Sequence, residues 1–127
     1  MTNGESVRDK YDLEERTAKF GEKIIQFAKK LPKSSITIPL ISQLVKAGTS
    51  VGANYSEADD AESKPDFKHK IGICKKEARE TKHWLRMVAV SLSEEKESCR
   101  KLWKEAHELT LIFAKISKKC QSLEIKN

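Results

Sequence analysis

Four segments of the chain repeat their apolar residues in alternating steps of three and four. In the first segment these residues are Leu13, Phe20, Ile24, Phe27 and Leu31, with the half-polar Thr17 filling one step. This spacing places a single apolar stripe along one face of an α-helix, which constrains the fold more than any other feature of the sequence. The same pattern predicts helices over about 13–31, 38–60, 64–91 and 94–121.

Short polar breaks separate the four segments. Pro32 stops the first helix, because proline lacks an amide hydrogen and clashes with the preceding turn. Three pairs of polar residues, each three positions apart, resemble capping boxes at helix starts. The connections are short, so we expect an all-α fold, an antiparallel up-down-up-down four-helix bundle over residues 12–122. Residues 1–11 are expected to form a flexible tail and residues 123–127 a frayed end. The three pairs are Asp12 with Glu15, Ser63 with Asp66, and Ser91 with Glu94.

The size and composition of the chain fit one self-sufficient domain. A chain of 127 residues can bury enough surface to fold without disulfides or a structural metal. Cys74, Cys99 and Cys120 have no metal-ligand spacing and fall on apolar helical faces, where a small buried hydrophobic role is expected. The sequence has no signal-peptide pattern and no apolar run that could span a membrane, so a cytoplasmic location is expected.

The third predicted helix carries most of the excess positive charge of a chain with net charge +6. Residues 65–92 contain seven Lys or Arg and three Asp or Glu. Five of these cations are aligned on one side of the helix over about 27 Å. Such a row can reach successive phosphates of a nucleic acid, whereas the alternative is that its charges only keep the protein soluble. The members of this basic row are Lys68, Lys75, Arg79, Lys82 and Arg86.

The opposite side of the same helix carries a tryptophan among polar residues. Tryptophan is enriched at interface centres, so this side predicts a surface that becomes buried. A polar line on the second helix matches it, and its buried polar groups need partners. We expect Lys70 or a backbone donor to bind Glu57, and Asn54 to fix the helix register. The residues assigned to this oligomer contact or polar network are Ser50, Asn54, Glu57, Lys70, Ile73, Glu77, Glu80 and Trp84.

Two glycines lie on the second helix, in line with Ile41 and Val45 and beside the apolar stripe. Glycine in a helix costs roughly 1 kcal/mol relative to alanine, and close approach of another backbone is the usual compensation. Gly48 and Gly52 therefore predict tight packing. The partner is either a neighbouring helix of the same bundle or another subunit.

Catalytic and metal-binding motifs are weak in this sequence. Glu80 and His83 form a Glu-x-x-His pair, which di-iron bundles use twice together with two further glutamates. His69 and His107 have no glutamate three positions before them, and His83 falls away from the apolar stripe. No Gly-rich phosphate loop is present. We therefore expect no enzyme activity, no metal and no cofactor.

The second and third predicted helices carry twelve residues in a characteristic order and spacing: Ser50, Gly52, Asn54, Glu57, Ala58, Phe67, Lys76, Glu77, Glu80, Thr81, Trp84 and Leu85. Through these residues the chain resembles the family of four-helix-bundle proteins encoded in intervening sequences of 23S rRNA genes. The resemblance implies a homopentamer with a basic surface or channel and a nucleic-acid-related role. A similar fold is the accessory protein of diversity-generating retroelements, which binds reverse transcriptase and nucleic acid.

These patterns favour a non-enzymatic basic oligomer that binds RNA or an RNA–DNA hybrid through backbone phosphates. Few aromatic residues lie near the basic row in the sequence, so the hypothesis does not include base stacking. An alternative is a protein-interaction scaffold whose basic face docks an acidic partner such as a reverse transcriptase. A third possibility is a structural oligomer whose charges serve only solubility.

Overall fold

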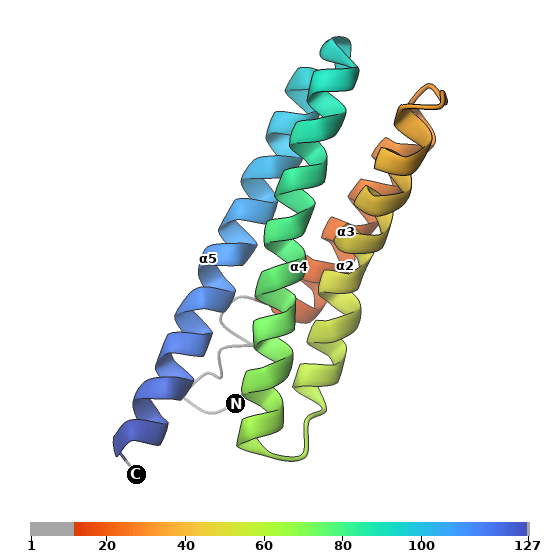
Figure 1. The fold of residues 1–127 in the computed structure, drawn as a ribbon. Coiled ribbons are helices and arrows are strands. Elements are labelled where there is room, and N and C mark those ends of the chain that lie inside the picture. The colour runs from red at the N-terminus through yellow and green to blue at the C-terminus, as the bar shows by residue number, and fades with distance from the viewer. Residues whose placement is uncertain (1–11, 127) are drawn as a thin grey trace.

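The computed structural model describes residues 12–126 as a bundle of four long α-helices (Figure 1). No strand occurs in this range, so the fold is all-α as predicted. Consecutive helices run in opposite directions, which gives the expected up-down-up-down arrangement (Figure 1). The helices are α2 (Leu13–Lys29), α3 (Thr37–Asp59), α4 (Lys64–Ser91) and α5 (Lys96–Lys126), with a short 3₁₀ helix η1 (Ser93–Glu95) before α5.

Helix α4 is the central element of the bundle. It packs along α3 on one side and along α5 on the other, and α2 packs along α3. Contact between α2 and α5 is slight, and α2 is also the shortest helix, with 17 residues against 31 in α5. Polar bonds help to close this side of the bundle. The Arg16 guanidinium donates to Glu105 at 2.8 and 2.9 Å and to Glu108 at 2.7 Å.

The predicted apolar stripes form the core. Buried threonines interrupt the stripes without leaving an unpaired hydroxyl, because Thr17, Thr81 and Thr110 each donate to the carbonyl four residues earlier. Leu40, Phe67, Leu102 and Cys120 lie at the edge of the core and are only half-buried. The largest fully buried side chains are Phe20, Phe113, Leu13, Ile24, Leu44, Ile71, Leu85, Leu109, Val51 and Val88.

One of the three predicted capping boxes begins its helix as expected. The Ser63 hydroxyl accepts a bond from the Asp66 amide at 3.2 Å, and Pro65 lies in the first turn. Asp12 instead adopts a left-handed backbone conformation, with φ 49°, and its side chain caps nothing, so that prediction is wrong. The prediction for Ser91 is also wrong, because its hydroxyl bonds back to the Val88 carbonyl inside α4.

Two helix ends differ from the expected positions. Helix α2 ends at Lys29, two residues before the predicted boundary. Helix α5 continues to Lys126, whereas we expected fraying after residue 122. The extension is physically reasonable, because no glycine or proline follows Gly72 in the chain. The expected N-terminal tail, residues 1–11, lies outside the described residues.

The two glycines of α3 pack against α2 within the same bundle, which decides between the alternatives left open by the sequence. A β-carbon at Gly48 would lie 2.8 Å from Cγ1 of Ile24, closer than atoms can approach. At Gly52 it would lie 3.3 Å from the Thr17 carbonyl oxygen. The small residues therefore let α2 and α3 approach closely, and they do not need a second subunit.

This packing predicts opposite effects for two glycine-to-alanine changes. Gly48→Ala should destabilise the protein by about 1–2 kcal/mol, because overpacking against the buried, β-branched Ile24 outweighs the gain in helix propensity. Gly72→Ala should stabilise it by up to about 1 kcal/mol, because nothing lies within 4 Å of the added carbon. Denaturant unfolding of both variants measures these changes. Equal effects would contradict the close α2–α3 contact.

Candidate nucleic-acid interface

The basic row lies on the side of α4 that meets α5. Lys82 marks this position, because its Nζ lies 3.0 Å from Nδ1 of His107 on α5. Arg79 and Arg86 are exposed, whereas Lys68, Lys75 and Lys82 are half-buried. Since α4 is continuous from Lys64 to Ser91, all five cations keep the alignment that their spacing predicted.

Most of the row carries uncompensated positive charge. Lys75, Arg79, Lys82 and Arg86 form no ion pair with any carboxylate in the described part of the chain. Other cations of the described chain do have carboxylate partners, such as Arg16 of α2, which pairs with Glu105 of α5. Uncompensated like charges at these spacings repel one another, so an anion placed against this side of α4 would relieve that repulsion.

An aromatic pair on α5 lies beside the basic row. The Trp103 indole stacks on the His107 imidazole, with ring centroids 5.0 Å apart and planes 16° apart. The Lys82 ammonium lies 5.1 Å from the Trp103 ring centroid, within cation–π range. Trp103 nevertheless keeps 38% of its surface exposed.

The sequence analysis missed this aromatic pair, because Trp103 and His107 belong to another helix than the basic row. The pair is close in space although Trp103 and His107 follow Lys82 by 21 and 25 positions. One signal could have found it. Lys82 and His107 are nearly equidistant from the turn at Leu92–Glu95, and antiparallel helices joined by a short turn bring such positions together.

The side of α4 that carries Trp84 meets α3 and forms the expected polar seam. Lys70 Nζ lies 2.5 Å from Glu57 Oε1, which confirms the expected partner of Glu57. The Trp84 indole donates to Glu80 Oε2 at 3.1 Å. Trp84 and Ile73 are both half-buried, so a single protomer covers this side only in part.

One member of the seam behaves differently from expectation. The Asn54 amide donates to the Ser50 carbonyl at 2.8 Å, within α3 itself. It forms no bond to another helix among the described residues, so the prediction that Asn54 fixes the register is wrong.

Burial raises the pKa of the Glu77 carboxyl, and the nearby charge of Glu80 raises it further. The fold is therefore more stable when the Glu77 carboxyl is protonated. This extra stability is lost as pH rises through the raised pKa.

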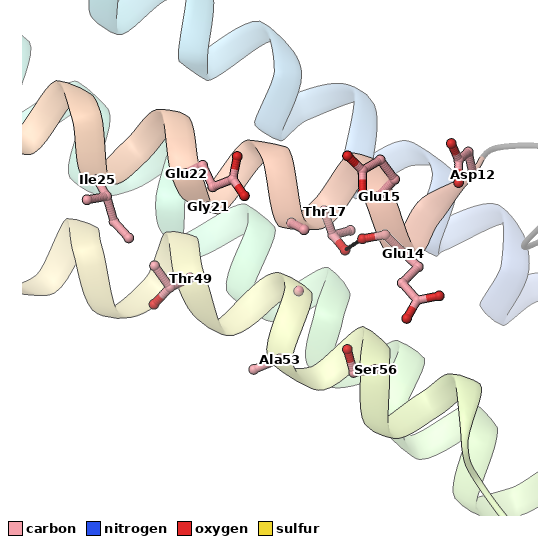
Figure 2. Close-up of a pocket in the computed structure, with 12 residues that line it drawn as sticks. Asp12, Glu14, Glu15, Thr17, Gly21, Glu22, Ile25, Thr49, Ala53 and Ser56 are labelled. Atoms are coloured by element: carbon pink, nitrogen blue, oxygen red, sulfur yellow. Dashed lines mark hydrogen bonds between the residues drawn. The ribbon is translucent and has the colours of Figure 1, made fainter.

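A groove of opposite charge runs between α2 and α3 (Figure 2). Its volume is about 560 Å³, and small side chains on both helices keep it open. Carboxylates at the start of α2 and along it make the groove electronegative, so it repels phosphates. The carboxylates that line it are Asp12, Glu14, Glu15 and Glu22.

The residues that could bind a metal or act as nucleophiles make other contacts or are buried. The Glu80 carboxylate accepts a hydrogen bond from the Trp84 indole. The exposed His83 ring packs edge-on against the same indole, with ring centroids 4.8 Å apart. No group of three or more His, Cys, Asp or Glu suited to a metal occurs among residues 12–126. Burial raises the pKa of the Cys74 thiol to about 12 and that of Cys99 to about 11, which suppresses the reactive thiolate. Within the same range, no helix has the length and apolarity to cross a membrane.

Comparison with known proteins agrees with this architecture. A crystal structure of a protein of unknown function from the S23 ribosomal protein family of Bacteroides thetaiotaomicron is similar, with 28% sequence identity and a TM-score of 0.77. The similarity covers 85% of this chain and 96% of that one. No protein with a curated description matches. The model of the 23S rRNA-intervening sequence protein family matches residues 9–115, and the chain therefore belongs to that family.

Proposed function

We propose that this protein binds nucleic acid through the basic row of α4, by contacts to backbone phosphates. The supporting observation is that Lys75, Arg79, Lys82 and Arg86 share one side of a rigid helix without a carboxylate partner in the described chain. Phosphate contacts of this kind supply affinity and little sequence preference. The family description names an rRNA intervening sequence, which makes RNA the first nucleic acid to test, and an RNA–DNA hybrid the second.

The proposal includes a homo-oligomer, for which the family resemblance implies five copies. The half-buried side chains of Ile73 and Trp84 support it, because a further protein surface could cover them. In a ring, five basic rows would act on one ligand. The local field grows with the number of copies, so a modest charge on one chain would become a strong polyanion site.

The double charge reversal Lys75→Glu/Arg79→Glu should abolish retention of labelled RNA at low salt. The milder variant Lys75→Gln/Arg79→Gln should reduce the slope of log K against log salt by about 1 to 2, since each phosphate contact contributes about 0.7 to 0.9. Filter binding or fluorescence anisotropy across a salt series measures both effects.

A matched control separates the basic row from net charge. Lys23→Glu/Lys29→Glu on α2 makes the same change in total charge at exposed positions away from α4. It should retain RNA far better than the α4 variant. Equal losses would show that only total charge matters. Undiminished retention by Lys75→Glu/Arg79→Glu would remove the row from the site. A protein partner that co-purifies after nuclease treatment would favour the scaffold function instead.

Light scattering should give a mass near five times 14.4 kDa, about 72 kDa, in nuclease-treated samples. Ile73→Lys should lower that mass, because a charge would then lie in the proposed contact. Val90→Lys is the control on the same helix, at a position 79% exposed, and should leave the mass unchanged. The mass of a single chain at micromolar concentration would overturn the oligomer.

A further inference from the structure

We propose that Trp103 is a stacking platform for an unpaired base, so that the ligand of the α4–α5 surface is a single-stranded nucleic acid. This inference rests on the proposed function and deepens it, because phosphate contacts alone do not distinguish single strands from duplexes. It names a binding residue outside the basic row and assigns a role to an aromatic side chain that the bundle core does not use.

The geometry leaves one face of the indole for a ligand. His107 stacks on one face, and the Lys82 ammonium lies only 3.0 Å from the His107 ring nitrogen. Both groups lie about 5 Å from the Trp103 centroid, so two groups this close together must share one side of the ring. The exposed 38% of Trp103 therefore belongs to the other face and the edges.

The stacked pair also holds the platform in place. A surface tryptophan would otherwise lose side-chain freedom when a ligand binds, and that loss weakens affinity. Here the His107 imidazole and the Lys82 ammonium already pack against one face of the indole and restrict its movement. Preorganisation of this kind allows more of the stacking energy to contribute to binding.

The surrounding charge suits a strand whose phosphates run beside the stacked base. Arg79 and Arg86 are exposed about one helical turn on either side of Lys82, roughly 4.5 and 6 Å away along α4. Aromatic platforms beside a basic groove are the combination that proteins use for single strands, because every base presents a π face. A duplex keeps its bases stacked internally and would use only the cations.

A protein ligand fits this surface less well. Lysine is depleted in the centres of protein–protein interfaces, whereas Lys82 here lies against the aromatic ring itself. The neighbouring Arg79 and Arg86 carry no carboxylate partner in the described chain, so a protein partner would have to supply several acidic groups around one tryptophan. A strand of nucleic acid supplies both the flat ring and the anions.

The test uses the full chain and follows the fluorescence of Trp103, obtained as the difference between the natural chain and Trp103→Leu. We expect a 12-nucleotide oligouridine RNA to quench its fluorescence, and a 12-base-pair RNA duplex or an abasic 12-mer to quench it far less. In the natural chain, Trp103→Leu should weaken oligouridine binding roughly 5- to 150-fold and leave duplex binding unchanged. Trp103→Phe should retain most of the affinity, because it keeps an aromatic face. Circular dichroism checks that each variant is folded.

The outcomes separate this inference from the proposed function. If the natural chain binds none of these nucleic acids, the proposed function fails and the platform fails with it. If it binds oligouridine and duplex equally, and Trp103→Leu changes neither, phosphate binding stands and the platform is overturned. If Trp103→Leu lowers the mass by light scattering instead of the RNA affinity, the residue belongs to a subunit contact and the platform is again overturned.

Discussion

The burial of one side of α4 between α3 and α5 fixes the arrangement of everything else. Ile71, Ala78 and Leu85 on this side have no exposed surface, and each buried Ile or Leu contributes about 1.5–3 kcal/mol. A helix advances 100° per residue, so a small rotation of α4 would expose this stripe. The rotation of α4 about its own axis is therefore strongly determined. Once it is set, the basic row must lie toward α5 and the Trp84 side toward α3.

This orientation separates the charges of the bundle. The acidic groove lies between α2 and α3, whereas Lys75, Arg79, Lys82 and Arg86 of α4 have no carboxylate partner in the described chain. Arg16 of α2, by contrast, is paired with Glu105 of α5.

Much of the fold could be predicted because it depends on periodicity and size. The stripes that contain Ile24, Val51 and Phe113 were readable as core, since burial follows the helical repeat. Helix caps were less predictable. Ser63 caps α4 as its spacing suggested, whereas Asp12 does not cap α2, because the same residue types also bond in turns or remain in solvent. The hydrogen-bond partner of Asn54 was equally hard to predict, because its amide bonds to a carbonyl of its own helix.

The sequence by itself determined four amphipathic helices, their antiparallel order and the alignment of Lys75, Arg79 and Lys82, because these depend on local spacing along one helix. Only the tertiary structure decided that Gly48 packs against Ile24, and that Trp103 and His107 of α5 lie beside Lys82. Such contacts depend on the relative rotation and register of two helices. Those quantities are set by how whole side chains interlock, and no spacing within one segment encodes them.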